Sequence, residues 1–204
     1  MSPSKARLAV AGTASAVLLL LGAAGTAEAR PLATPDQAAA VAAAPSYATW
    51  IADVTAVTTP AAAYLEQRLA VPGGRNAIVL DIDNTSLETH YNPAFTTPAV
   101  KPVLALAKLA KAKGAAVLFV SDRTEVIRWP TEGNLKAVGY PNDGLHLRPL
   151  FNFDPVQTNK TKARIAIEQA GYTIVANIGN NLTDLDGGHA ERTFKLPDYN
   201  GALS

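Results

Sequence analysis

The fold of this chain is decided by the stretch Ala77-Ile78-Val79-Leu80-Asp81-Ile82-Asp83-Asn84-Thr85, in which four apolar residues run directly into a pair of carboxylates. An unbroken apolar run of this length is typical of a strand buried on both faces, as in a parallel sheet. In open α/β sheets, ligands bind beyond the carboxyl ends of the strands. The stretch therefore predicts a buried strand over 77–80, with Asp81 and Asp83 at the carboxyl edge of the sheet, where ligands bind.

Beyond this strand, apolar runs and helical patterns alternate along the chain. Further strands are predicted at 115–120, 145–150, 172–178 and 192–196, and helices at 98–113, 131–138 and 160–170. Because the strand cores are unbroken apolar runs, we expect a mostly parallel sheet with helices on both faces. The sequence therefore predicts an α/β fold.

Upstream of the strand, residues 47–69 carry apolar side chains at spacings of three and four, which is typical of a helix. We expect Pro60 to divide this segment into two helices, because proline removes a backbone hydrogen bond inside a helix. The turn Val71-Pro72-Gly73-Gly74 ends the segment. We therefore predict an N-terminal helical extension at 30–75 and a core domain at 76–204.

Residues 1–29 have the three-part pattern of a secretory signal peptide. Lys5 and Arg7 form a positive start, an apolar stretch follows, and small residues precede a cleavage site after Ala29. We expect cleavage there and export to the extracellular space or the periplasm. An uncleaved membrane anchor is the alternative, although the apolar stretch is short for a spanning helix.

Composition narrows the classes of function. The chain has no cysteine, which excludes disulfides, a thiol nucleophile and a thiolate zinc site. Its net charge is +1, and loss of Lys5, Arg7 and Glu28 with the leader makes the mature chain neutral. Nucleic acid is not an expected partner, because phosphate-tracking proteins usually carry a basic surplus. No second apolar run is long enough to span a bilayer, so we expect no stable membrane association after cleavage. Nothing in the sequence predicts the oligomeric state.

The carboxylate pair suits acid–base and nucleophilic chemistry. One carboxylate can attack an electrophile, while the other donates a proton to the leaving group and later activates water. A solvated acidic turn would have the same residues. The ends of the other strands favour the chemical interpretation, because Ser121 follows the predicted strand at 115–120 and can hold a phosphate oxygen.

Two further segments extend this pattern. Lys160, at the start of a predicted helix, can neutralise both a carboxylate nucleophile and a phosphate, although a surface lysine is the simpler interpretation. Gly179-Asn180-Asn181-Leu182-Thr183-Asp184 follows the strand at 172–178. Its oxygen atoms can complete a hard-cation site with Asp81, which suits Mg²⁺.

The order of an Asp pair, Ser, Lys and Gly-Asn-x-x-x-Asp resembles the four motifs of the haloacid dehalogenase (HAD) superfamily. Flanking stretches are similar to its secreted acid phosphatases, subfamily IIIB. The matching stretches include Phe119-Val120-Ser121-Asp122-Arg123, Lys160-Thr161-Lys162-Ala163-Arg164 and Phe194-Lys195-Leu196-Pro197. The resemblance extends from about Ala77 to Tyr199 and implies a HAD-like Rossmannoid sheet with a small cap segment at 86–98.

The resemblance also implies a role for each matched residue. Asp81 would be the nucleophile that forms an aspartyl-phosphate, and Asp83 the general acid and base. The substrate's phosphoryl group would be held by Ser121 and Lys160. Apart from the resemblance, we also predict that Asp122 and Arg123 bind the substrate, and a place on the surface of a helix is the alternative for Arg123. The metal ligands for Mg²⁺ would be Asp81, the backbone carbonyl of Asp83, Asn180 and Asp184, of which Asp184 would act through a water molecule or as a support for the other ligands. The family usually has aspartate at the Asn180 position, so we expect weaker metal affinity here.

We therefore predict a secreted, Mg²⁺-dependent acid phosphatase that hydrolyses small phosphomonoesters. Two alternatives use the same fold. One is a non-catalytic phosphate-binding or storage protein, which the missing charge at Asn180 leaves open. The other is a phosphotransferase that passes the phosphoryl group to an alcohol acceptor through the same residues.

Overall fold

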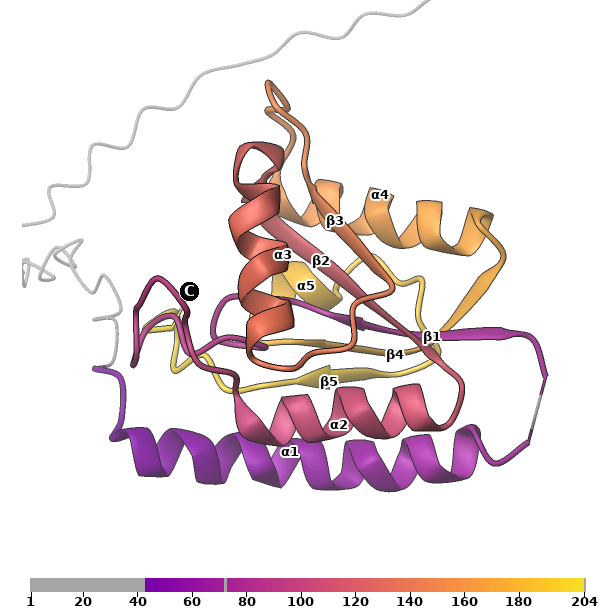
Figure 1. Cartoon of the computed structure of the whole chain (residues 1–204), viewed down its shortest axis with the longest axis horizontal. Helices are drawn as coiled ribbons and strands as arrows, with labels where there is room; N and C mark the ends of the chain where they lie inside the picture. Colours follow the sequence, from indigo (N-terminus) through magenta and orange to yellow (C-terminus); the bar gives the residue numbers. More distant parts are fainter. Residues whose placement is uncertain (1–42, 72, 204) are drawn as a thin grey trace, which may run out of the picture. The chain divides into compact units, whose positions relative to one another are not determined.

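A computed structural model describes residues 43–71 and 73–203 of the chain (Figure 1). Its centre is a sheet of five strands in the order β3-β2-β1-β4-β5, with every neighbouring pair parallel. The strands are β1 Arg75–Leu80, β2 Ala116–Thr124, β3 Gly144–Arg148, β4 Tyr172–Gly179 and β5 Thr193–Lys195. The parallel α/β sheet predicted from the sequence is confirmed.

Five α-helices and one 3₁₀ turn accompany the sheet in the described part of the chain. They are α1 Tyr47–Arg68, α2 Lys101–Ala112, η1 Glu125–Ile127, α3 Arg128–Ala137, α4 Val156–Gln169 and α5 Leu182–Leu185. Helices α2, α3 and α4 each end just before a glycine with a left-handed backbone, as at Gly114 after α2. Such a glycine is the common signal for the end of a helix.

The side chains of β1 alternate between two apolar layers. Ile78 and Leu80 belong to the larger layer, which also contains buried residues of α1 and α2. Ala77 and Val79 belong to the other layer and pack with Ile167 of α4. Figure 1 shows α1 and α2 on one side of the sheet and α4 on the other. The prediction of helices on both faces is confirmed.

The predicted break at Pro60 is wrong, because α1 runs through this residue as a single helix. Residues before it, such as Trp50, and after it, such as Leu65, are buried in the same apolar layer. An interior proline costs a helix about 3 kcal/mol, whereas full burial of one large apolar side chain contributes about 1.5–3 kcal/mol. Packing on both sides of Pro60 therefore outweighs the lost hydrogen bond.

The predicted signal peptide at 1–29, its cleavage site after Ala29 and residues 30–42 of the predicted extension lie outside the described residues. Within the described ranges, no helix has both the length and the apolar character needed to cross a membrane.

The segment at 86–98, predicted to form a small cap, is a loop fastened to its surroundings. The ring of Tyr91 stacks on Trp50 with 4.7 Å between ring centroids, and Glu88 accepts a hydrogen bond from Tyr47 at 2.8 Å. At the other end, Asn134 of α3 exchanges two hydrogen bonds with the backbone of Thr97, both 2.8 Å long. These contacts hold the loop beside the carboxyl end of β1.

Candidate active site

The register of the sheet brings three strand ends to one place. Leu80, the last residue of β1, lies level with Phe119 of β2 and Ile178 of β4. The chain leaves the sheet at its carboxyl edge shortly after each of these positions. A cavity of about 150 Å³ at this edge is lined by Asp81, Asp83, Ser121, Asp122, Val156, Lys160, Asn180, Asn181, Thr183, Asp184 and Leu203. All predicted site residues except Arg123 line this cavity.

Lys160 links the first and last predicted motifs. Its buried ammonium donates to Oδ1 of Asp81 at 2.7 Å and to Oδ1 of Asp184 at 2.5 Å. Both carboxylates are themselves buried. One cation therefore balances only one of two buried anions, and burying a charge without a partner is costly. A further positive charge bound near these carboxylates would therefore be stabilised electrostatically.

The pKa of Asp81 reflects this imbalance. Burial raises the pKa of Asp81 to about 7, and Asp184 and Asp83 add to the rise, while Lys160 opposes it. Burial alone would lower the pKa of Lys160, but Asp81 and Asp184 raise it above the ordinary value. Lys160 is therefore a fixed cation, and any additional cation near Asp81 would favour its ionised, nucleophilic form.

Asp83 stands at the rim of the cavity, where its side chain is 44% exposed. Arg123 donates to both of its oxygens, from Nε at 2.9 Å and from Nη2 at 2.7 Å. Arg123 therefore holds the side chain of Asp83 and does not itself line the cavity, whereas the sequence analysis predicted that Arg123 contacts the substrate. Asp122 lines the cavity but forms an ion pair with Arg148, whose Nε lies 2.9 Å from its Oδ1.

The side chain of Asn180 is held by two hydrogen bonds in the described part of the chain. Its Nδ2 donates to the backbone carbonyl of Leu203 at 2.8 Å, and its Oδ1 accepts from the hydroxyl of Thr85 at 3.1 Å. The same Leu203 carbonyl accepts from Asn84 at 2.9 Å. A carbonyl only accepts hydrogen bonds, so the amide orientation of Asn180 follows from this contact.

Asp184 is fully engaged with the protein. Its Oδ1 accepts from Lys160, and its Oδ2 accepts from the backbone N–H of Asn181 at 2.8 Å. The carboxylate approaches Gly179 so closely that an added Cβ there would lie 2.4 Å from it. Glycine is therefore required at this position. Asp184 holds Lys160 in place, and neither of its oxygens is free of a protein donor.

Two sets of contacts beside the cavity were missed by the sequence reasoning. Arg164 is fully buried and donates to the backbone carbonyls of Asp184, Asp186 and Gly188, which fixes the loop that carries Asp184. Its spacing of four residues from Lys160 places both on one face of α4 and was a usable signal. The contact of Asn84 with Leu203 had no such signal, because these residues are far apart in the sequence.

The donor set at the cavity fits a hard cation. Magnesium is usually bound through one or two carboxylates and keeps several waters. Asp81, Asp83 and Asn180 line the cavity with such oxygens, and within the described ranges nothing donates a hydrogen bond to Oδ2 of Asp81. No group of three or more His, Cys, Asp or Glu side chains in the described residues is arranged to hold a metal.

Comparisons with known proteins show the family of this chain. The sequence model of the HAD superfamily, subfamily IIIB (acid phosphatase), matches residues 91–202. The stem 28 kDa glycoprotein of Glycine max is 35% identical over 122 residues, which cover 56% of this chain and 47% of that protein. Vegetative storage protein 1 of Arabidopsis thaliana is 34% identical over 104 residues, covering 50% of this chain and 38% of that protein. The chain spans less than half the length of these relatives.

The fold has a solved counterpart. The class C acid phosphatase from Bacillus anthracis aligns with a TM-score of 0.57 and 22% identity, covering 70% of this chain and 67% of that chain. The α/β fold is therefore shared with that phosphatase. Because the family model spans more than half of the 204 residues, the chain belongs to subfamily IIIB of the HAD superfamily, the acid phosphatase subfamily.

Proposed function

We propose that this protein is a phosphomonoesterase that uses Asp81 as its nucleophile. The observation that carries the proposal is the contact of Lys160 with both Asp81 and Asp184, next to Ser121 in one cavity. A buried carboxylate held by a buried lysine is unusual in a purely structural site, because burying such charges costs stability. Membership of the acid phosphatase subfamily supports the same assignment.

The proposed reaction has two steps. In the first, Asp81 attacks phosphorus in line and forms an aspartyl-phosphate, while Asp83 protonates the departing alcohol oxygen. In the second, Asp83 takes a proton from a water molecule that hydrolyses the aspartyl-phosphate. Lys160 and the hydroxyl of Ser121 would hold the oxygens of the transferring group, where its negative charge develops.

The proposed cofactor is Mg²⁺, which would be held by the carboxylate of Asp81, the backbone carbonyl of Asp83 and the side-chain oxygen of Asn180. When bound, the ion supplies positive charge beside the nucleophile and the phosphoryl oxygens. Asp184 would support this site by holding Lys160, since both of its oxygens accept hydrogen bonds from the protein. Arg123 would hold Asp83 at the rim, where it can meet the leaving group or water.

The proposed substrate is a small phosphorylated molecule, and the proposed location is outside the cytoplasm after cleavage at Ala29. Recovery of the protein from the medium or the periplasm tests the location, and N-terminal sequencing of that fraction tests the cleavage. Absence of the protein from both fractions would contradict the location, and an exported chain that still begins at residue 1 would contradict cleavage at Ala29.

Phosphate release from p-nitrophenyl phosphate tests the activity. We expect Mg²⁺-dependent release by the wild type and loss of at least about a hundredfold in Asp81→Asn, which keeps the shape but removes the nucleophile. Lys111→Ala removes an exposed lysine of α2 that pairs with Asp143 and lines no part of this cavity, so it is the control and should retain activity. No release by the folded wild type at any metal concentration or pH would overturn the proposal.

A second candidate, a non-catalytic storage or phosphate-binding protein, is favoured by one observation. The chain has an amide at Asn180, and one relative is named a vegetative storage protein. Binding of inorganic phosphate without turnover of p-nitrophenyl phosphate would support this candidate. Adding glycerol to the phosphatase assay separates hydrolysis from transfer, because a phosphotransferase would produce glycerol phosphate.

A further inference from the structure

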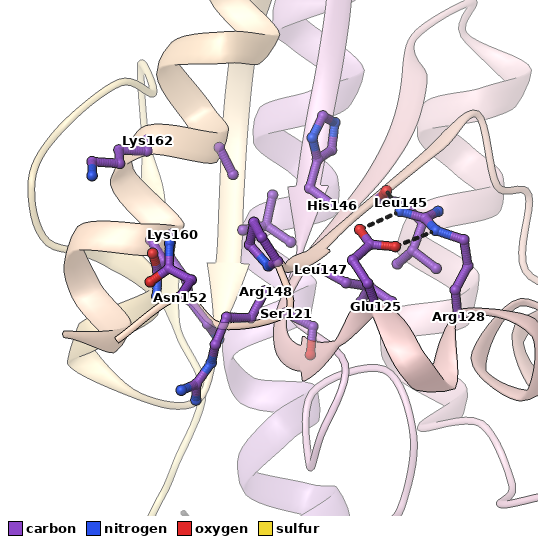
Figure 2. A pocket seen from close by; sticks show the side chains of 14 residues that line it. Ser121, Glu125, Arg128, Leu145, His146, Leu147, Arg148, Asn152, Lys160 and Lys162 are labelled. Carbon is purple, nitrogen blue, oxygen red and sulfur yellow. Dashed lines mark hydrogen bonds and ion pairs between the residues drawn. The ribbon is translucent and has the colours of Figure 1, made fainter. Parts of the chain in front are cut away.

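A second, larger cavity of about 290 Å³ adjoins the candidate active site (Figure 2). Ser121 and Lys160 line both cavities, so the second begins where the transferring phosphoryl group would be held. Its other lining residues are Val120, Glu125, Arg128, Leu145, His146, Leu147, Arg148, Pro149, Asn152, Asn159, Lys162 and Ala163. The alcohol part of a substrate held by Ser121 and Lys160 would therefore find space in this cavity.

His146 borders the cavity on the side of the sheet that faces α4. It is the register partner of Val120 in β2, so these two side chains lie on the same face of the sheet. Val120 belongs to the apolar layer against which Ala163 of α4 packs. Leu145 and Leu147, the neighbours of His146 in β3, belong to the layer on the opposite face. The imidazole ring therefore lies between the sheet and α4, among the side chains that line the cavity in Figure 2.

The ring of His146 has uncommitted polar atoms. Within the described residues no hydrogen bond reaches either ring nitrogen, and neither nitrogen is closed off from solvent. Burial lowers the pKa of His146 below the ordinary value of 6.5, and Arg128 lowers it further, while Glu125 acts in the opposite direction. The ring is therefore neutral at pH 7 and becomes a cation only in acid. A neutral imidazole has one donor and one acceptor, whereas the protonated ring has two donors and a positive charge.

The other charged side chains of the lining come from η1, α3, β3 and α4, and each has a partner of opposite charge. The pairs are Arg128 with Glu125, Arg148 with Asp122, Lys162 with Asp154, and Lys160 with Asp81 and Asp184. The dashed lines in Figure 2 show the first pair, in which Arg128 donates to both oxygens of Glu125 at 2.7 Å. A proton on His146 would therefore add a positive charge that has no partner in the lining.

The charge state of this one ring changes which ligand group the cavity can hold. An anion enclosed beside a neutral ring would find no free cation, and burying a charge without a partner is costly. Beside the protonated ring, the same anion would gain a charged hydrogen bond, which is stronger than one between neutral groups. Histidine is the side chain whose charge ordinarily changes between pH 5 and 8.

We propose that the second cavity binds the alcohol part of the substrate and that His146 determines the charge of the alcohol it selects. The neutral ring selects an uncharged alcohol, and the protonated ring selects an alcohol that carries a carboxylate. The inference rests on the proposed phosphatase function. The hydrolysis step is the same for both alcohols: the bond between phosphorus and the ester oxygen breaks, Asp83 gives a proton to that oxygen, and water supplies the new phosphate oxygen.

A matched pair of esters, assayed across pH, tests this role. Sorbitol 6-phosphate and 6-phosphogluconate differ only in a terminal hydroxymethyl group against a carboxylate. Titration of the phosphate group and of Asp81 affects both esters alike, so it cancels in the ratio of their kcat/KM values. We expect the ratio for 6-phosphogluconate over sorbitol 6-phosphate to rise about tenfold from pH 7.5 to pH 5, the value of one charged hydrogen bond. A constant or falling ratio would overturn the inference.

Variants of His146 identify the group that titrates. His146→Gln keeps a donor and an acceptor but never gains a charge, and His146→Phe keeps a flat ring without polar atoms. In both variants the ratio should be independent of pH. The control is His189→Gln, the same substitution at a histidine that pairs with Glu168 outside the cavity, and it should keep the pH dependence of the wild type.

The outcomes separate this inference from the proposed function. If the wild type hydrolyses neither ester nor p-nitrophenyl phosphate at any pH, both proposals fail. If it hydrolyses them but a His146 variant with the wild-type melting temperature retains the pH-dependent ratio, only the role of His146 is overturned.

Discussion

Asn180 donates a hydrogen bond from its side-chain amide to the backbone carbonyl of Leu203 at 2.8 Å, at a position where the resemblance to the family led us to expect an aspartate. Asn84 donates to the same carbonyl, so two amides from separate strand ends hold one backbone group at the edge of the cavity. An aspartate at 180 could not donate to this carbonyl. Compared with an aspartate, the amide therefore lacks one negative charge near the proposed metal site. It gains a hydrogen bond that holds the segment around Leu203 against the cavity.

The substitution Asn180→Asp should separate these two effects. We expect the variant to reach half-maximal activity at a lower Mg²⁺ concentration, because a carboxylate binds the ion more strongly than an amide. Without metal, its free energy of unfolding should fall by about 1 kcal/mol, the value of the lost hydrogen bond. Metal titrations of activity and urea unfolding in EDTA measure the two quantities. If the variant needs as much Mg²⁺ as the wild type or more, the explanation of Asn180 is wrong.

Removal of Lys160 should affect both stability and activity. In Lys160→Ala, Asp81 and Asp184 remain buried without their cation, and breaking a buried ion pair in this way costs about 3 kcal/mol. Urea unfolding at pH 8 should show this loss, and phosphatase activity should fall by about a hundredfold or more.

The control for Lys160 is Lys162→Ala. Lys162 pairs with Asp154 at the surface, where such pairs contribute about 1 kcal/mol or less. Equal loss of stability in the two variants would contradict the role of Lys160 as the buried partner of both carboxylates.

Arg164 should be a positioning residue for the loop that carries Asp184. Arg164→Lys keeps the positive charge but cannot reach the carbonyls of Asp184, Asp186 and Gly188 together, because lysine lacks the planar fork of donors. We expect a loss of about 2 kcal/mol in unfolding free energy and a fall in kcat that exceeds the change in KM. Unchanged kcat in a destabilised variant would indicate a purely structural role.

The pH dependence of stability should include Glu191. Hydrogen bonds from Arg68, at 2.7 Å to each carboxylate oxygen, lower the pKa of Glu191 below its unfolded value of 4.5. A lowered pKa stabilises the fold above the unfolded value, and this contribution is lost as pH falls through the folded pKa. The pair ties α1 to the segment before β5.

Glu191→Gln should therefore be less stable than the wild type at pH 6 by about 1 kcal/mol or less, because the pair is partly exposed. The difference should shrink when the pH is lowered below the folded pKa. Urea unfolding across this pH range measures it, with Glu66→Gln, an exposed glutamate of α1, as the control. A difference that grows on acidification would contradict the assignment.

Much of the fold was predictable because its signals are local. The apolar run at 77–80 became β1, and the run at 172–178 became most of β4, since such runs are stable only when a sheet is covered on both faces. The carboxyl ends of parallel strands meet at one edge, so the sequence order alone predicted that Asp81 and Asn180 would share a site. The helix boundaries were less accurate, because capping and packing decide where a helix stops.

Pro60 shows where local signals failed. Proline disfavours a helix interior, but the residues on both sides of it bury their side chains in one apolar layer. That layer is assembled from segments far apart in the chain. A prediction from the neighbouring residues alone therefore counted the free-energy cost of proline in a helix but not the stabilisation from burying the side chains on both sides of it.

The sequence by itself determined the parallel α/β sheet, the family and the set of residues at the strand ends, because hydrophobic period and motif order are properties of the chain. Only the tertiary structure decided how those residues are used. It paired Lys160 with two carboxylates, assigned Arg123 to Asp83, held Asn180 against Leu203 and placed His146 at the second cavity. Hydrogen bonds and ion pairs depend on distances of a few ångströms between segments that are distant in sequence, and such distances are set only when the core packs.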